Sequence, residues 1–258
     1  MKLYLNFFAM HLKSQMQYKI TFILNIFGRI ILSFATVAGV LFMFTRFNEV
    51  EGFSLNQVLL CMSVVSMAFS IAEVFARGFD IFPRLITNGE FDRALVRPRG
   101  IIFQILASHI EFVRLGIFIQ ALAVLIYAAP NSGVDWTFDK ILTLFLMISC
   151  GAIIFFCLYI VYASFAFFTI EGLEFMNILT YGGREFGRYP YAIYGEGILR
   201  FLTYIVPMAL FQYYPLLYIL GREENKLYMF APLLSVIFVI PAYLFWRFGV
   251  SRYKSNGS

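Results

Sequence analysis

Charged residues are scarce in this chain: Asp, Glu, Lys and Arg make up 14% of its 258 residues, whereas soluble domains contain about 25%. Apolar residues make up 61%, and the mean hydropathy is +0.79. This composition excludes a soluble globular domain and predicts an integral membrane protein. The apolar runs are continuous over about twenty residues instead of alternating over about ten, which favours helices over a closed barrel. We therefore expect an all-α protein with a single transmembrane domain over residues 1–258.

Residues and motifs that carry chemistry are also scarce. The two histidines, His11 and His109, are too far apart in sequence to suggest a helix-borne metal pair. The chain contains no GxxxxGK[ST], HExxH or GxSxG motif. The three cysteines fall inside apolar runs, where a thiol is ordinarily a small hydrophobe, and show no metal-binding spacing: Cys61, Cys150 and Cys157. We expect a chain that is not an enzyme and that binds no metal or cofactor itself.

Long apolar runs dominate what is present. Six stretches are long and apolar enough to cross roughly 30 Å of hydrocarbon. They lie near 20–44, 57–76, 101–129, 141–168, 199–220 and 228–246. No soluble domain fits into the polar stretches between them.

The basic residues predict the orientation, because short cytoplasmic loops hold an excess of Lys and Arg. With the N-terminus inside, the inner side receives fourteen of them: Lys2, Lys13, Lys19, Arg77, Arg84, Arg93, Arg97, Arg99, Arg184, Arg188, Arg200, Arg247, Arg252 and Lys254. The outer side receives four: Arg46, Lys140, Arg222 and Lys226. Six spans with both termini inside follow. The net charge of +5 then faces anionic lipid head groups and requires no nucleic acid.

Residues 1–18 are predicted to form an amphipathic helix on the inner membrane surface. On a helical wheel, one sector is polar: Lys2, Asn6, Lys13 and Gln17. A separate sector is apolar: Leu5, Phe8, Leu12 and Met16. An interfacial anchor is favoured over an unstructured leader, although Leu3 and His11 depart from this pattern.

The loop over residues 77–100 combines high charge with helical spacing. Pro83 suits a first helical turn. Apolar residues recur at i, i+3, i+6 and i+7: Phe79, Phe82, Leu85 and Ile86. Asn88 and Gly89 predict a turn, with Asn88 capping a second short helix that ends before Pro98. Two short amphipathic helices form a docking surface in this interpretation. The alternative is a solvated loop that only fixes the topology.

Four ionisable residues fall within predicted spans: Arg29, Glu73, Glu111 and Arg114. Glu111 and Arg114 are three residues apart on one helical face, so they can pair and offset each other's desolvation. One interpretation is a structural ion pair near the inner end of the third span. The other is that these residues line an inward-facing cavity on the translocation path, since charges in membrane helices face protein or water.

Proline interrupts the fifth predicted span. Pro207 and Pro215 each remove a backbone donor and predict helix breaks on the outer side of the membrane. The segment after Pro215 is expected to re-enter the membrane or to lie at its outer surface.

Two motifs in the chain resemble those of the permease subunits of ABC-2 type ABC transporters. The first is G-E-[FL]-D-x-x-L-x-R-P, carried by "GEFDRALVRP" from Gly89 to Pro98. The second is P-x-A-x-x-x-Y-Y-P, carried by "PMALFQYYP" from Pro207 to Pro215. The resemblance covers essentially the whole chain in the number of spans and the position of the loops.

This resemblance implies a half-transporter that dimerises with itself or with a second, similar permease. It implies two copies of a separate cytoplasmic ATPase subunit, which would bind ATP and Mg²⁺. It also implies that the permease lies in the cytoplasmic membrane of a prokaryote. The loop after the second span would supply the coupling helix that contacts the ATPase, with seven candidate residues: Phe79, Phe82, Glu90, Phe91, Asp92, Arg93 and Arg97. The implied activity is ATP-driven export of a drug, lipid, glycan or peptide.

The alternative function is an ion-coupled carrier or a non-transporting accessory membrane subunit. A carrier is expected to show an internal repeat and an acidic residue near the membrane centre. No convincing repeat is found, and the acids cluster near the inner ends of the spans. An aromatic-rich interior suits a hydrophobic or amphipathic substrate, while the substrate's identity and the choice of homodimer or heterodimer stay open.

Overall fold

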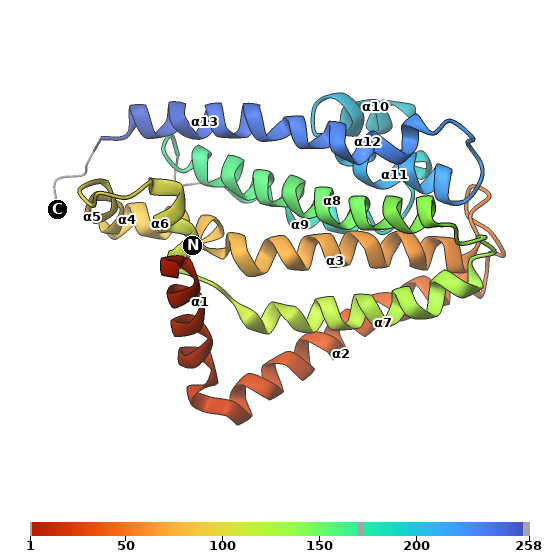
Figure 1. Ribbon diagram of the computed structural model, residues 1–258, viewed down its shortest axis with the longest axis horizontal. Helices are drawn as coiled ribbons and strands as arrows, with labels where there is room; N and C mark the ends of the chain where they lie inside the picture. Colours follow the sequence, from red (N-terminus) through yellow and green to blue (C-terminus); the bar gives the residue numbers. More distant parts are fainter. Residues whose placement is uncertain (1, 170–172, 255–258) are drawn as a thin grey trace.

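A computed structural model describes residues 2–169 and 173–254 of the chain. This part is helical except for its loops and one isolated β-bridge, and five of its helical stretches are long and apolar enough to cross a membrane. They contain α2 (Lys19–Phe44), α3 (Leu55–Asp80), α7 (Leu115–Asn131), α8 (Phe138–Phe165), and α12 (Leu227–Ser235) with α13 (Val239–Arg252). Figure 1 shows these helices running roughly along the long axis of the molecule. Four of the six expected spans are therefore confirmed within a few residues.

The crossing expected at 199–220 is sharply bent. It consists of α10 (Glu196–Tyr204) and α11 (Met208–Ile219), whose axes differ by 112°. Pro207 lies directly before α11, where its missing N–H and fixed φ prevent α10 from continuing. Pro215 lies inside α11, so the break predicted at Pro215 is wrong. Membrane helices tolerate such a proline because only one backbone hydrogen bond is lost and neighbouring groups compensate.

The single span expected at 101–129 is wrong. The stretch forms α6 (Ile101–Ser108) and α7, and these are separated by non-helical residues 109–111 and a 3₁₀ turn, Phe112–Arg114. The N–H of Glu111 donates to the carbonyl oxygen of Val74 in α3, at 3.3 Å, instead of continuing a helix. Only residues 112–131 of this stretch are long and apolar enough to cross.

The chain after α8 turns back along the bundle. Its described part forms a 3₁₀ turn (Leu173–Ile178), α9 (Tyr181–Phe186) and a second 3₁₀ turn (Tyr191–Tyr194). The guanidinium carbon of Arg184 lies 5.1 Å from the ring centroid of Phe69, in the middle of α3. The inner-surface position expected for Arg184 is therefore wrong, because this segment continues along α3 toward α10.

This path also changes the count of basic residues at the two ends. Helix α10 lies in the half of the bundle away from the termini (Figure 1), and it carries Arg200 with it. Eleven basic residues remain at the end with the termini: Lys2, Lys13, Lys19, Arg77, Arg84, Arg93, Arg97, Arg99, Arg247, Arg252 and Lys254. Five lie at the other end: Arg46, Lys140, Arg200, Arg222 and Lys226. The excess still favours the end with the termini as the cytoplasmic one.

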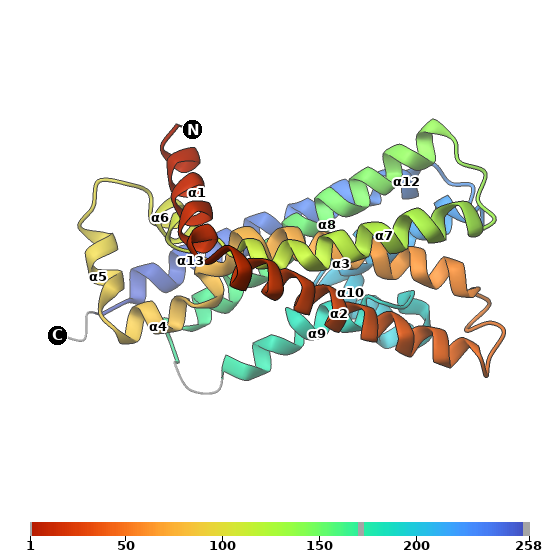
Figure 2. The ribbon, with the colours of Figure 1, turned by 90° about the horizontal axis from the view of Figure 1, so that it is seen from below.

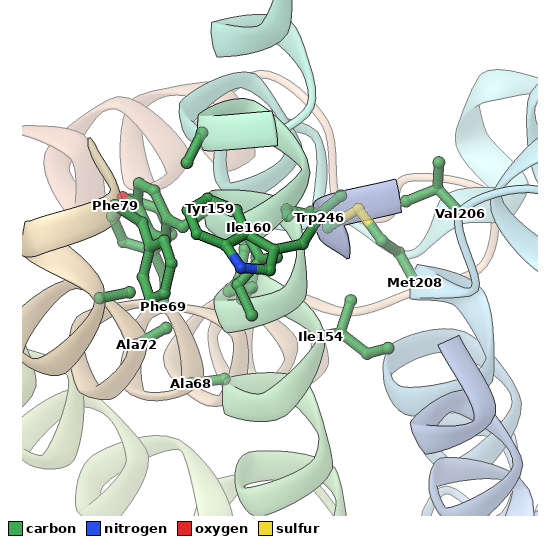
Figure 3. Close-up of a cluster of buried hydrophobic side chains, with 14 of the residues drawn as sticks. Ala68, Phe69, Ala72, Phe79, Ile154, Tyr159, Ile160, Val206, Met208 and Trp246 are labelled. Atoms are coloured by element: carbon green, nitrogen blue, oxygen red, sulfur yellow. The ribbon is translucent and has the colours of Figure 1, made fainter. Parts of the chain in front are cut away.

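Helix α3 is the centre of the bundle. In the most apolar 18-residue stretch of the span that contains α3, 89% of the residues are buried. The corresponding share in the span that contains α2 is 17%. Helix α8 packs closely on α3, since a Cβ added to Gly151 would lie 2.9 Å from the Cβ of Ala68. Figure 3 shows the surrounding core, with aromatic rings from α3, α8 and α13 and smaller side chains at the α10–α11 bend: Phe69, Phe79, Tyr159, Trp246, Val206 and Met208.

Shorter helices gather at the end of the bundle that carries both termini (Figures 1 and 2). They are α1 (Lys2–Gln15), α4 (Phe82–Thr87), α5 (Glu90–Leu95) and α6. Helix α1 runs across this end instead of along the bundle, as a surface helix would. Lys13 is exposed and Phe8 and Leu12 are partly buried, whereas the side chains of Lys2 and Leu5 lie outside the described part. The interfacial location of α1 stays a prediction.

Candidate functional site

The α4–α5 hairpin, residues 82–95, directly continues the central helix. Only Ile81 separates α3 from α4, and Pro83 lies in the first turn of α4. Gly89 provides the turn with a φ of 68°, a backbone region that glycine adopts without strain. Gly89, and not Asn88, precedes α5, so the cap predicted for Asn88 is wrong; its amide donates instead to Glu90 Oε1, at 3.5 Å. Helix α5 ends at Leu95, before Pro98, as predicted.

Three of the candidate coupling residues face the protein interior. Phe79, Phe82 and Phe91 are each at most 1% exposed. The ring of Phe82 packs edge-on against Phe91, 5.1 Å away, and against Trp246 of α13, also 5.1 Å away. Phe79 contacts the same tryptophan, at 5.5 Å. These rings therefore attach the hairpin to the bundle and are not accessible to a partner in this conformation.

The remaining candidates lie on or near the outer face of the hairpin. Glu90, Arg93 and Arg97 are exposed, whereas Asp92 is partly buried. The hydroxyl of Tyr253 donates to Asp92 Oδ1, at 3.0 Å. Desolvation, and then the hydrogen bond and charge of Asp92, raise the pKa of Tyr253, which keeps this hydroxyl a neutral donor. Asp92 therefore ties the hairpin to the end of α13.

A charge network lies where α3 leads into the hairpin. Its members are Glu73, Arg77, Asp80, Glu111 and Arg114. Arg114 Nη1 lies 2.7 Å from Glu73 Oε1, and its Nε lies 3.2 Å from Glu111 Oε2. Arg77 Nε lies 3.0 Å from the same Glu111 oxygen, and Arg77 also pairs with Asp80. The network therefore connects α3 with the break between α6 and α7.

The predicted Glu111–Arg114 pair is thus present, but it lies at the start of α7 and not inside a continuous span. The structure adds Glu73 as the second partner of Arg114. It also shows each member lining a cavity: Arg114 one of about 410 Å³ and Glu111 one of about 450 Å³. The structural pair is therefore present and lies beside two cavities, while a place for these residues on a translocation path stays a prediction.

Arg29 is not part of an ion pair within the described residues. It lies on α2, and its Cβ would be 3.2 Å from a Cβ added to Gly116 of α7. Its positive charge still contributes to the electrostatic attraction on Glu73, as does that of Arg184. Arg29 therefore supports the network from a distance.

Arg77, Asp80 and Tyr181 are members of the site that sequence reasoning missed. The hydroxyl of Tyr181 donates to Asp80 Oδ2, at 3.3 Å, and connects α9 to the end of α3. A signal was present for the first two, because Glu73, Arg77 and Asp80 follow i, i+4, i+7 spacing on one face of a helix. Nothing in the sequence indicates that Tyr181 lies beside them.

Helix α1 stabilises the break between α6 and α7. The side-chain amide of Gln15 donates to the carbonyl oxygen of Ile110, and its oxygen accepts a hydrogen bond from the N–H of Phe112, at 3.0 Å. His11 Nε2 lies 2.9 Å from the carbonyl oxygen of Ala107. Backbone groups freed by a break at membrane depth need such partners. This contact explains why His11 departs from the amphipathic pattern of α1.

Replacing Gln15 with leucine is expected to lower the free energy of unfolding by about 1–3 kcal/mol, because two backbone groups lose their partner. Amide hydrogen exchange at Phe112 should also become faster, and mass spectrometry of peptides covering the break measures it. Gln17→Leu is the matched control, since Gln17 is exposed on the 3₁₀ turn that follows α1. Equal effects of the two variants would show that the Gln15 contacts are not stabilising.

Two cavities flank Arg77 and Arg84 at this end of the bundle. The larger, about 450 Å³, includes Glu90, His109 and Glu111 in its lining, and the other includes Asp80 and Tyr181. Their polar linings can hold water or a polar group of a ligand. Within the described residues, no three His, Cys, Asp or Glu side chains are grouped to hold a metal ion.

The helical architecture, with five apolar spans and one bent pair, defines a multi-pass membrane protein. A family model described as ABC-2 family transporter protein matches residues 30–257. The chain therefore belongs to the ABC-2 family and is a permease, the membrane component of a transporter. The comparisons with curated proteins and with solved structures found no match.

Proposed function

We propose that this chain is the permease subunit of an ATP-driven exporter that works with a separate ATPase subunit. Family membership carries the proposal. The sequence supports it, because a transporter of this class needs ATP and the chain has no motif for binding nucleotide phosphates. ATP and Mg²⁺ would then be bound by the partner, in two copies for each pair of permeases.

The α4–α5 hairpin is the proposed surface for the ATPase. It lies at the end with the termini, and its outer face carries the exposed charges of Glu90, Arg93 and Arg97. Its inner face is fixed by the ring of Phe82, which packs against both Trp246 and Phe91. A force on the exposed face would therefore move the hairpin together with α13 and the end of α3.

The charge network is the proposed connection from the hairpin to the rest of the bundle. When the ATPase subunits close, the end of α3 would move, and Arg77 and Asp80 move with it. Arg77 pairs with Glu111 at the α6–α7 break, and Asp80 accepts the Tyr181 hydroxyl of α9. Packed elements of this kind shift between discrete arrangements, which supports alternation between inward-open and outward-open states.

The proposed location is the cytoplasmic membrane of a prokaryote, with both termini in the cytoplasm. The excess of basic residues at the end with the termini supports this orientation. The functional unit is proposed to be a dimer with a second copy or a similar permease. Lipid and this second subunit would cover the apolar surface of α2, where only 17% of the most apolar window is buried.

The proposed substrate is hydrophobic or amphipathic, such as a drug, lipid, glycan or peptide. The polar cavities beside Arg77 and Arg84 can accept the polar part of such a molecule, while the aromatic core and surrounding lipid suit its apolar part. Export that stops on ATP depletion would support the proposal. Transport that persists without ATP and stops with the proton gradient would favour an ion-coupled carrier instead.

A double charge reversal, Glu90→Lys with Arg93→Glu, tests the ATPase surface. We expect about a tenfold or larger loss in the amount of ATPase that co-purifies with the permease, because reversed charges at an interface repel a matched partner. Asp92 is left unchanged, since its bond to Tyr253 stabilises the permease itself. The ATPase to co-express is one that carries Walker motifs, to be sought among the proteins encoded next to this chain.

The matched control is Glu196→Lys with Arg200→Glu, which reverses an exposed pair at the opposite end of the bundle. The control should co-purify with the ATPase as the unchanged chain does. Equal retention by both double variants would exclude the hairpin as the ATPase surface. Loss of the ATPase from both double variants would show that charge reversal lowers co-purification wherever it is made on the permease.

A further inference from the structure

A groove lies between α13 and the beginning of α6, at the end of the bundle that carries the termini. It has a volume of about 400 Å³, and one helical face of α13 forms most of its wall: Tyr243, Trp246, Arg247, Val250 and Ser251. These positions follow i, i+3, i+4, i+7, i+8 spacing. Gly100, Ile101 and Ile102 complete the lining from the α6 side.

The groove is mainly apolar, but it contains one positive charge. Arg247 is exposed, and no carboxylate of the described residues lies within 4.0 Å of it. The other exposed arginine near this end of α13, Arg252, lies over the ring of Phe248, at 5.4 Å. Arg247 is therefore a cation on an apolar helix face to which the described part of the chain supplies no counter-ion.

The depth of Arg247 in the membrane indicates what can supply the negative counter-charge. The span Leu227–Arg252 has 26 residues, which corresponds to about 39 Å at 1.5 Å per residue and exceeds the roughly 30 Å of hydrocarbon. Arg247 lies five residues from the end of α13, or about 7.5 Å along the helix axis. Its long side chain can therefore extend to the level of the lipid phosphates.

We propose that this groove binds one molecule of an acidic phospholipid, with the phosphate on Arg247 and an acyl chain along Tyr243 and Trp246. Charge complementarity favours this occupant. An arginine at membrane depth needs an anionic partner, and basic pockets between membrane helices are suited to anionic head groups. The apolar wall next to Arg247 distinguishes a lipid from free phosphate, which would gain nothing from it.

The inference does not depend on the proposed exporter activity or on the ATPase, since a lipid site beside α13 requires only the fold. Binding is measured on the purified full-length chain in detergent, by native mass spectrometry with added phosphatidylglycerol or phosphatidylcholine. We expect the unchanged chain to retain phosphatidylglycerol in preference to phosphatidylcholine. Arg247→Gln should weaken the binding of phosphatidylglycerol about tenfold, because a charge-assisted contact to the phosphate is lost.

A second variant tests the apolar part of the groove. A Cβ added to Gly100 meets no atom within 4 Å, and the φ of Gly100 is −56°, so Gly100→Leu introduces no strain. Its side chain should occupy the groove and reduce lipid binding without changing the charge. Glycerol phosphate added in excess should not displace the lipid, since it lacks the acyl chain.

Arg252→Gln is the matched control, because it removes another exposed arginine from the same helix outside the groove. This control should bind phosphatidylglycerol as the unchanged chain does. Equal binding by the unchanged chain and Arg247→Gln would overturn the proposal. An equal loss of binding in Arg247→Gln and Arg252→Gln would also overturn it, because that result would indicate nonspecific attraction to the surface. A lipid-free dimer in which a second copy covers the groove would overturn it as well.

Discussion

Replacing Arg114 with methionine is expected to lower the free energy of unfolding by about 3–5 kcal/mol, the largest loss among single charge removals in this chain. Arg114 Nη1 lies 2.7 Å from Glu73, whose side chain is 1% exposed. Without Arg114, a buried carboxylate loses its nearest cation, and Glu111 loses one of its two arginine partners. Denaturation in mixed detergent micelles measures the change.

The physical cause can be separated from loss of packing by a second variant. In the double variant Arg114→Met with Glu73→Gln, the unpaired charge is removed together with its partner, and most of the lost stability should return. Arg200→Met is the control, because its pair with Glu196 is exposed and worth at most about 1 kcal/mol. Equal losses in the single and double variants would show that Arg114 acts through packing and not through its charge.

The membrane class and most of the spans could be predicted from the sequence because hydropathy is a local property. A run such as α8 is apolar over its whole length, and no distant residue is needed to recognise it. The Glu111–Arg114 pair was predictable for the same reason, since three residues separate its members. The partners of these two residues on α3 were not, because Glu73 and Arg77 are distant in sequence.

The break at residues 109–111 could not be predicted because distant residues stabilise it. The hydropathy of 101–129 supports one long helix. The groups that bond to the backbone at the break are distant in sequence: Gln15, 95 residues away from Ile110, and the carbonyl oxygen of Val74. The same reason explains the burial of Phe82. Its spacing shows that it lies on an apolar face, while the ring that covers it, Trp246, comes from the far end of the chain.

The chain after α8 shows a further limit. Its arginines suggested the cytoplasmic surface, yet Arg184 lies over the ring of Phe69, in the middle of α3, and pairs with the exposed Glu185. A charge count assigns a residue to a side but gives no depth. Gln212 of α11, which is fully buried, donates to the carbonyl oxygen of Tyr189 at 2.9 Å and helps to stabilise this irregular segment. Here the polar groups needed at depth come from tertiary contacts.

Replacing Gly78 with alanine is expected to be strongly destabilising. A Cβ at Gly78 would lie 2.0 Å from the carbonyl oxygen of Ile105 and 3.0 Å from Ser108 Oγ. The first contact is with the backbone of α6, so no side-chain rotation relieves it. Helix α6 would have to move, and we expect a loss of about 3 kcal/mol in the free energy of unfolding.

The same displacement should have a specific consequence for the site. Helix α6 leads into residues 109–111, so moving it disturbs the carbonyls that His11 and Gln15 contact and the position of Glu111 between Arg77 and Arg114. Hydrogen exchange should therefore rise at Phe112 as well as in α6. If the hairpin is the ATPase surface, as proposed, transport should fall while the ATPase is still retained, because the connection to α7 is loosened and the exposed face of the hairpin is unchanged.

Gly39→Ala is the matched control for this substitution. Gly39 lies inside α2, and a Cβ there meets nothing within 4 Å. Alanine should stabilise that helix by up to about 1 kcal/mol, because it costs less backbone entropy than glycine. A Gly78→Ala variant as stable as Gly39→Ala would show that α6 is not held against α3 at this point, and the route from the hairpin through the α6–α7 break would then be wrong.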